Sequence, residues 1–506
     1  MANLNDKDLL SDIISSSEGL AFQDRLKNEV LEYTEKKQLT GRAKTNLLKN
    51  LSYPLDDDTI KALCLLKETG ITDKGDNLPF SRAKDLNDLW KMLIEKSIQC
   101  LRLFDIREPF KKNPEKTIVA YGIEELDKYY KKYTKFEGLL YGANAKYRDH
   151  IFHVFRTWLI GLHVIIKRKF DIEDIDGLKE TWESYGKLST CEKISMWTII
   201  AFCHDLGYPL EKAKDILHVT QDMMQKIVTD SKVSADFSFG GTQTSINEYI
   251  VRFISTKMKH HVEQNEAGEQ HYNGRIQPKY YFKFTKSLEN FAHGIVSAII
   301  IYTMLLYFNE SDFNLNDDYR YDGEDARQFY IRREILRAIA AHTCPDIYSV
   351  KITTFSSLLY ICDEMQNWDR KDWHELYSAQ ELNTTAVSIT TFDETTIAYI
   401  EEIKLGEKAD IKQFSLDLFK NRYVKYKKKF RDGQYSAQRS FDIKDTVICE
   451  KDISGTTKPS VAITINIMGN NTSDKFEIKH VNCNDNEQMT DNDIKDSVFK
   501  HEFKKC

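Results

Sequence analysis

The sequence predicts a mainly helical protein with a small α+β region at its C-terminal end. Hydrophobic residues make up 41% of the 506 residues, and with only 8 prolines there are few helix breakers. Over most of the first 370 or so positions, apolar residues recur three or four apart, which is the spacing of one helix face. Beyond about residue 376 the pattern changes to strict alternation, which is the period of a half-buried strand.

These changes in pattern divide the chain into three expected regions. Residues 1–100 form an N-terminal helical region, in which we find no recognisable chemistry. Its helices are expected over DLLSDIISS, AFQDRLKNEVLEYTEKK and DDTIKALCLLKETG, the last beginning at acidic residues typical of a first turn. Residues 101–375 form the central region, and residues 376–506 form the α+β region.

Composition narrows the classes of function. The net charge of −6 argues against a protein that coats nucleic acid, so nucleic acid is not a favoured partner. The nine cysteines show no CxxC pairing, which is typical of reduced thiols. The N-terminus has no apolar signal-peptide core, and the longest apolar run, Ile295–Phe308, is too short to span a bilayer. We therefore expect a cytoplasmic protein with no membrane segment.

Ionisable residues are embedded in five apolar segments of the central region. A buried imidazole or carboxylate is costly unless it is paired or bound to metal. One such residue is usually a hydrogen-bonded core residue, but six on five hydrophobic helices indicate a shared site. Imidazole and carboxylate together suit divalent first-row metal ions. The six residues are His153, His204, Asp205, His293, His342 and Asp363.

The pair His204-Asp205 follows a nearly apolar run, Ile194–Ile200. Gly207 and Pro209 then break the pattern, so the pair is expected at the mouth of a buried helix.

Two later stretches of the central region, 231–245 and 257–279, are polar and contain glycine. We predict that both are irregular insertions on the helical scaffold.

The α+β region has its own order of elements. TTAVSITTF and TTIAYIEEI predict a hairpin that turns at Asp393-Glu394, and DIKQFSLDLFKNRYVKYKKKF predicts a basic amphipathic helix. The basic face near Lys425–Lys429 is expected to be solvated. Clean alternation predicts a strand over Ser460–Met468, which pairs with Asp474–Val481.

The order H…HD…H…H…D between about Tyr147 and Arg370 resembles the HD-domain superfamily of metal-dependent phosphohydrolases, and His204-Asp205-Leu206-Gly207 is its most specific piece. The resemblance implies a helical HD core and two divalent metal ions, which Mn, Fe, Mg, Ni and Zn fit equally well. One ion would be held by His153, His204, Asp205 and Asp363, and Asp205 would bridge to a second ion held by His293 and His342. Tyr208 departs from the pattern, because many HD enzymes that act on cyclic dinucleotides carry Lys there.

The implied activity is hydrolysis of a phosphoester or phosphodiester bond, in a nucleotide or cyclic nucleotide, by a metal-activated water. The sequence has no nucleophile elbow and no GxxxxGK loop, so the His/Asp set is the only candidate catalytic cluster. Asp205 and His150 are the candidate catalytic residues, with His150 as general acid. The candidate phosphate ligands are Arg148, Arg156, Lys212 and Arg370.

Two other classes of protein stay open at this point. One is a nucleotide-sensing regulatory or interaction protein built on an HD core, and the other is a di-iron oxygenase on the same scaffold. The sequence also leaves a homo-oligomer open.

Overall fold

The structure is a computed structural model of the whole chain. It describes residues 4–18, 22–36, 52–71, 83–103, 122–143, 149–168, 170–172, 188–228, 241–262, 270–310, 319–347, 350–368, 384–393, 396–405, 411–430, 440–449, 460–468, 475–481 and 488–489, with positions 38, 41, 44, 45, 48, 232 and 234. Helices make up most of these residues, so the predicted fold class, mainly α, is confirmed.

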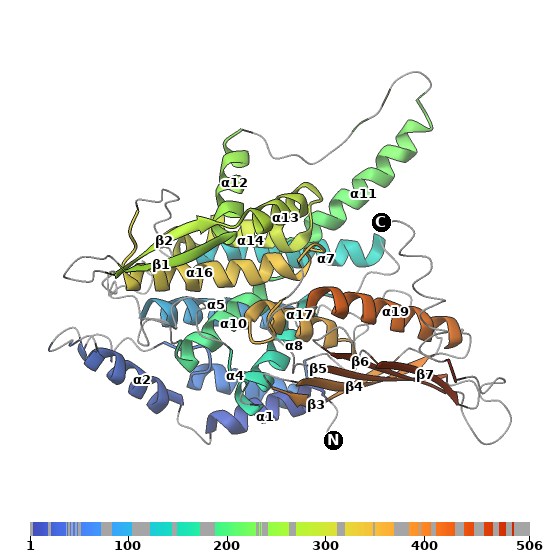
Figure 1. Cartoon of the computed structure of the whole chain (residues 1–506), viewed down its shortest axis with the longest axis horizontal. Coiled ribbons are helices and arrows are strands. Elements are labelled where there is room, and N and C mark those ends of the chain that lie inside the picture. Colours follow the sequence, from blue (N-terminus) through green and yellow to red (C-terminus); the bar gives the residue numbers. More distant parts are fainter. Residues whose placement is uncertain are drawn as a thin grey trace.

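A buried helix, α10 (Thr190–Cys203), lies at the centre of the fold (Figure 1). It begins at a capping box, in which the Ser189 side chain accepts from the Glu192 backbone N–H and the Glu192 side chain accepts in return. Its residues are apolar on nearly every side, and it packs against α5 (Ala83–Leu103), α8 (Ile151–Leu162) and α16 (Gly323–His342). A helix that is hydrophobic all round needs neighbours on several sides, and these three helices supply them.

The remaining helices surround this centre. They are α1 (Asp6–Glu18), α2 (Phe22–Lys36), α4 (Asp57–Thr69), α7 (Ile123–Ala143), the π-helical turn η1 (His163–Lys167), α11 (Tyr208–Gln225), α12 (Thr242–Ile254), α13 (Pro278–Glu289), α14 (His293–Met304), α15 (Leu306–Asn309), α17 (Phe355–Met365) and α19 (Ile411–Phe430). The three helices predicted before residue 70 correspond to α1, α2 and α4, and Asp56 caps α4 by accepting from the Thr59 N–H.

The C-terminal region is α+β, as predicted. Six strands lie in the order β3 (Thr384–Phe392), β4 (Thr396–Leu405), β5 (Ser440–Cys449), β6 (Ser460–Met468), β7 (Lys475–Val481) and β8 (Gln488–Met489). The predicted hairpin is β3–β4, and the predicted partner strands are β6 and β7. Among the described strands, only β4 and β5 pair in parallel. Helix α19 forms the crossover that a parallel pair requires, and it packs on β5 and β6.

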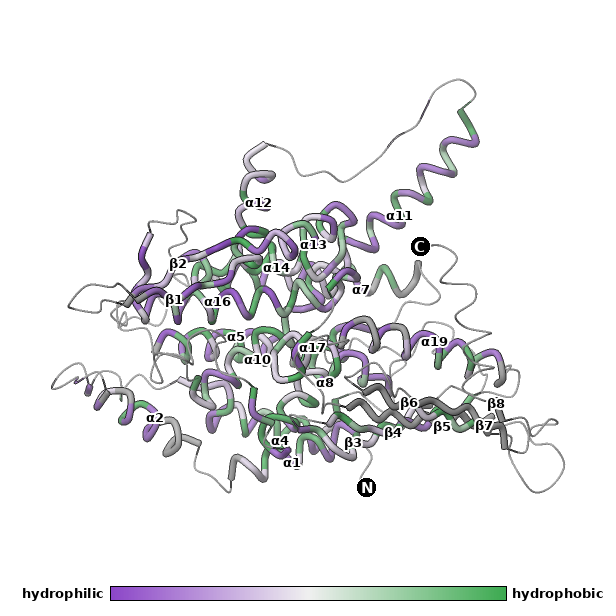
Figure 2. Tube along the Cα trace, viewed as in Figure 1, coloured by the Kyte–Doolittle hydropathy of each residue, from purple (hydrophilic) through white to green (hydrophobic). Residues whose placement is uncertain are grey.

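The two stretches predicted to be irregular are partly regular, so that prediction was wrong. Strand β1 (Thr256–Val262) pairs antiparallel with β2 (Gln270–Ile276), and α12 begins at Thr242. Figure 2 shows largely hydrophilic residues along this hairpin. Its inward anchors are few, Met258 and Tyr272 among them, so the alternation that marks a half-buried strand is faint in the sequence.

The prediction of a solvated basic face on α19 was also wrong in part. Lys425 is half-exposed at 52% of its side chain, but Lys429 is buried at 7% exposure. A lysine is rarely buried unless its ammonium group has acceptors, and the carbonyl oxygens of Ala341 and Cys344 supply them.

One hydrophobic core continues through all three expected regions, from Leu4 to Ile465. The Leu4 N–H donates to the carbonyl of Val387 on the edge strand β3, which joins the start of the chain to the C-terminal sheet. The expected boundary at residue 100 falls inside α5, and the boundary at 376 lies outside the described residues. Among the described helices, none is both long and apolar enough to cross a membrane.

Candidate metal centre

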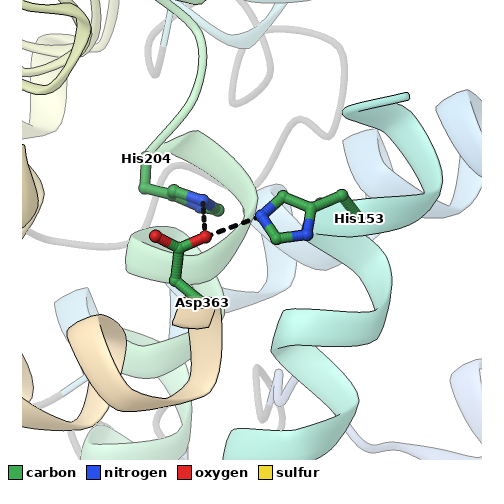
Figure 3. Close-up of side chains that lie close together, drawn as sticks. All are labelled: His153, His204 and Asp363. Atoms are coloured by element: carbon green, nitrogen blue, oxygen red, sulfur yellow. Dashed lines mark hydrogen bonds and ion pairs between the residues drawn. The ribbon is translucent and has the colours of Figure 1, made fainter. Parts of the chain in front are cut away.

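The ends of five helices deliver the six predicted ligands to one place. His153 lies in the first turn of α8, and His204-Asp205 form the turn after α10. His293 begins α14, His342 ends α16, and Asp363 lies in the last turn of α17. Figure 3 shows His153, His204 and Asp363 pointing toward one another from three different helices.

Two groups of three side chains are close enough to share an ion. The ligand atoms of His153, His204 and Asp363 all lie within 4.8 Å of one another, as do those of His204, Asp205 and His342. In the first group, the distance from Asp363 Oδ1 to His153 Nε2 is 2.7 Å, and to His204 Nε2 it is 3.8 Å. The described residues therefore include buried His/Asp clusters that could hold a metal ion.

Asp205 belongs to the second group, and its two carboxylate oxygens face different imidazoles. Oδ2 is 3.4 Å from His204 Nε2 and 3.9 Å from His153 Nε2. Oδ1 is 3.3 Å from His293 Nε2 and 3.7 Å from His342 Nε2. A carboxylate in this position can offer one oxygen to each of two neighbouring ions.

Hydrogen bonds to the backbone orient two of the imidazoles. His204 Nδ1 donates to the carbonyl of Ala201 at 2.8 Å, and His342 Nδ1 donates to that of Ile339 at 2.5 Å. Because a carbonyl oxygen can only accept, the neutral form of each ring keeps its lone pair on Nε2. Both Nε2 atoms are buried and make no hydrogen bond within the described part of the chain. This is the arrangement of histidines that ligate metal in proteins.

Two side chains that the sequence did not single out orient the other imidazoles. His153 Nδ1 donates at 2.6 Å to the amide oxygen of Gln366, and the Gln366 amide nitrogen donates to the carbonyl of Trp368. Glu211 accepts from both the backbone N–H and Nδ1 of His293, at 2.7 and 2.8 Å. Gln366 follows Asp363 by three positions at the end of an apolar helix, and this polar residue was a signal available in the sequence. Glu211 lies among other charged residues of α11, and nothing in the sequence marks it.

Glycine allows the helices that carry the ligands to approach closely. A Cβ atom at Gly294 would lie 2.5 Å from Thr343 Oγ1, 2.6 Å from the Ile339 oxygen and 2.9 Å from His342 Cε1. One at Gly207 would lie 2.5 Å from the His293 oxygen. Because glycine has no Cβ atom, α16 and the turn that contains His204-Asp205 can lie directly against the start of α14.

In the metal-free protein, attraction between the carboxylates and the imidazoles of the cluster sets their charge states. Burial disfavours the imidazolium of His204, but Asp205 and Asp363 outweigh it and raise its pKa to about 10. Burial acts likewise on His293, and Asp205 and Glu211 raise its pKa to about 9. Burial lowers the pKa of His342, and its contact with Asp205 only partly offsets this.

The two carboxylates shift in the opposite direction. Burial opposes ionisation of Asp205 and Asp363, but hydrogen bonds and attraction to the neighbouring imidazoles outweigh it and hold both pKa values well below the usual range. The carboxylates of the cluster thus bind positive charge, which in the metal-free protein is carried by protonated imidazoles. Divalent ions are the other cations that this donor set suits.

His150 lies beside the cluster. Its Nε2 is 4.0 Å from Asp205 Oδ2, and its Nδ1 is 3.5 Å from Glu137 Oε1. Glu137 is fully buried on α7, and it also accepts the backbone N–H of His150 at 2.5 Å. The ring of Tyr208 stacks on that of His150, with centroids 3.8 Å apart. Glu137 lies in a polar, lysine-rich helix, so nothing in the sequence marks it as a site residue.

The candidate phosphate ligands fall into three groups. Lys212 lies near the cluster, with Nζ 5.4 Å from the Tyr208 ring centroid and 3.0 Å from Asp215. Arg156 is fully buried, and its guanidinium forms a bidentate pair with Asp6. This pairing assigns Arg156 to holding α1 on α8 rather than to substrate. Arg148 and Arg370 lie outside the described residues.

The fold and the cluster together define a mainly helical protein whose buried imidazoles and carboxylates could hold metal. Comparison with protein-family models, with curated proteins and with solved structures found no match.

Proposed function

We propose that the protein is a metal-dependent phosphohydrolase of the HD type, which cleaves a phosphoester or phosphodiester bond in a nucleotide or cyclic nucleotide. The observation that carries the proposal is the position of Asp205, whose two oxygens face two different sets of imidazoles. An isolated metal site needs no such bridge, whereas a two-ion site does. The order of the six residues along the chain also resembles that of the HD superfamily.

The donor set fits two divalent ions. The buried Nε2 atoms of His204 and His342 make no hydrogen bond within the described residues, and each faces an oxygen of Asp205, at 3.4 and 3.7 Å, so an ion bound there would have both donors. His153, His204, Asp205 and Asp363 would hold one ion, and Asp205, His293 and His342 would hold the other. When bound, two such ions lower the pKa of a water molecule and neutralise charge on phosphoryl oxygens.

The surrounding residues prepare the cluster for this role. Gln366 and Glu211 fix the rings of His153 and His293, so that their Nε2 atoms face the carboxylates. Burial keeps bulk water away from His153, His204 and Asp205, which strengthens electrostatic interactions at the site.

His150 would carry the proton that the leaving group requires. When the P–O bond to the leaving group breaks, its oxygen takes a proton from His150 Nε2, and the attacking water gives up one proton to solvent. Glu137 Oε1 lies 3.5 Å from Nδ1 and would favour a proton on that nitrogen, and stacking on Tyr208 holds the ring in place. Lys212, next to Tyr208, is the described cation best placed to meet a phosphate.

A hydrolysis screen tests the function. The metal-depleted protein is reloaded with Mn²⁺, Mg²⁺, Ni²⁺ or Fe²⁺ and offered deoxynucleoside triphosphates, cyclic mono- and dinucleotides, guanosine polyphosphates and single-stranded nucleic acid. We expect turnover of one nucleotide class, dependent on metal, with ¹⁸O from solvent in the phosphate after a single turnover.

Asp205→Ala is the decisive variant, because it removes the bridging carboxylate. It should lose both ions and all turnover, whereas the exposed Asp222→Ala on α11 should keep both. Full metal content in Asp205→Ala, or a covalent phospho-enzyme, would refute the proposal.

A further inference from the structure

One face of α19 lies along the helices that carry the metal ligands. Arg422, Tyr426 and Lys429 recur three or four positions apart, and all three are buried. Tyr426 lies against Tyr360 of α17, with ring centroids 6.0 Å apart. This face therefore connects the C-terminal sheet, on which α19 packs, to the metal cluster.

Lys429 makes the most direct connection. Its Nζ donates to the carbonyl of Cys344 at 2.8 Å and to that of Ala341 at 3.1 Å. The same ammonium lies 5.2 Å from the ring centroid of Tyr360. In return, the Lys429 carbonyl accepts the N–H of Val350 at 2.8 Å.

The two carbonyls flank a metal ligand. Ala341 precedes His342 and Cys344 follows it by two positions, so Lys429 binds the backbone on both sides of this residue. The C-terminal end of a helix carries partial negative charge, and its last carbonyls have no helical partners. A buried ammonium group there offsets the charge and donates hydrogen bonds to the carbonyls. His342 Nδ1 uses the Ile339 carbonyl one turn earlier. The backbone around His342 is thus held from two directions.

A second set of contacts reaches the helix that carries Asp363. Arg422 pairs with the buried carboxylate of Glu401, and Asn367 donates to Glu401 Oε1 at 3.2 Å. Asn367 directly follows Gln366, the residue that orients His153. Lys425 also pairs with Glu364, but at the half-exposed surface.

We propose that Lys429 is a positioning residue of the metal centre: by fixing the end of α16, it sets His342 and thereby the ion that His342 holds. The inference rests on the two-ion site proposed above. It makes the C-terminal α+β region part of the site rather than an appendage. Because His342 belongs to only one of the two groups of ligands, loss of Lys429 weakens one ion and spares the other.

Titration of the metal-free full-length protein with Mn²⁺ tests this. Lys429→Met keeps the aliphatic length but removes the charge and the donors, and we expect one of the two binding steps to lose about 10- to 100-fold in affinity, as for other residues that orient ligands. Lys429→Arg restores a cation with donors and should recover most of the affinity. The matched control is Lys425→Met, on the same helix, which should bind both ions as the wild type does because its ion pair is half-exposed.

The outcomes separate the two proposals, since the measurement is metal binding and not hydrolysis. A folded Lys429→Met protein with wild-type affinity for both ions refutes the positioning role, as does equal weakening of both ions. If Lys429→Met does not fold, Lys429→Gln, which retains one donor group, is judged by the same criterion. A wild-type protein that binds no ion refutes the metal centre itself and this proposal with it.

Discussion

His150 lies between the buried carboxylate of Glu137 and the central carboxylate of Asp205. If it supplies the proton to the leaving group, His150→Ala should slow turnover by about 10²-fold, the usual contribution of a general acid. Metal content should stay unchanged, because Asp205 keeps its other imidazole contacts. Single-turnover kinetics and elemental analysis on the same preparation measure the two effects.

Substrates with a good leaving group provide the control for this variant. Such a leaving group needs no proton, so the deficit of His150→Ala should shrink with a nitrophenyl phosphoester. An equal deficit with both substrates would mean that His150 acts on the ions or the fold instead.

The stability of the metal-free protein should depend on pH through the same cluster. The folded pKa values of His204 and His293, about 10 and about 9, lie above the value of about 6.5 for an unfolded chain. Their contribution is therefore fully present below about pH 6.5 and is lost as the pH rises through 9 to 10. Asp205 and Asp363 act in the opposite direction, because their contribution is present above about pH 4 and is lost in stronger acid.

Denaturant titrations of metal-free protein at pH 7 and pH 10 measure this dependence. The metal-loaded protein is the control, and its stability should fall less, because its imidazoles are already deprotonated. A metal-free protein equally stable at both pH values would contradict the assigned charge states.

For individual residues, the sequence predicted which side chains lie together at the candidate site, but not which other side chains orient them. His153, His204 and Asp363 were recognisable because each is polar within an apolar helix. Glu137 and Glu211 lie in helices with many other charged residues, so no local contrast marks them. Only the packing of the helices shows that they face imidazoles.

At the scale of helices, the contact between α14 and α16 sets the distance between His293 and His342, whose ring centroids are 5.1 Å apart. Gly294→Ala would place a Cβ within 2.9 Å of His342 Cε1 and closer still to the Ile339 carbonyl, so the helices must separate. We expect a cost of about 1–3 kcal/mol, typical of overpacking, together with weaker binding of one ion. Thermal unfolding and Mn²⁺ titration measure both effects.

Gly41→Ala is a useful comparison for this substitution. Its φ of +61° strains a side chain, but an added Cβ meets nothing within 4 Å. It should lower stability and leave metal affinity unchanged. Unaltered metal binding by Gly294→Ala would show that the approach of these helices does not limit the site.

Elements with a strong period were predictable, and those stabilised by a few contacts were not. The alternation over Ser460–Met468 and the apolar run before His204 each correspond to an observed element. The hairpin β1–β2 escaped detection because its outward residues are polar and its inward anchors are few. Lys429 was predicted to be solvated, but it is buried against the end of α16. The sequence shows that a residue is charged, but not whether the end of another helix packs next to it.

At the scale of the whole molecule, the first helix is bound to the rest by a buried ion pair. Asp6 accepts three hydrogen bonds from Arg156 on α8 and one from the indole of Trp368 after α17. Asp6→Ala leaves the buried guanidinium without this carboxylate, so we expect a loss of about 3–5 kcal/mol in the free energy of unfolding. Denaturant unfolding measures it.

Asp8→Ala, in the same first turn but exposed, is the matched control and should cost no more than about 1 kcal/mol. Similar losses in the two variants would mean that the pair with Arg156 adds little to stability.

The bridge between Leu4 and Val387 has a consequence for synthesis on the ribosome. Translation proceeds at about 5–20 residues per second, so the start of the chain waits roughly 20–80 s for its partner strand to be made. Asp363, too, is translated long after His153, so no nascent chain can assemble the complete ligand set early. The face of α8 that packs on α17 has no partner until residues 355–365 are made, so we expect chaperone binding to the nascent chain as part of its folding.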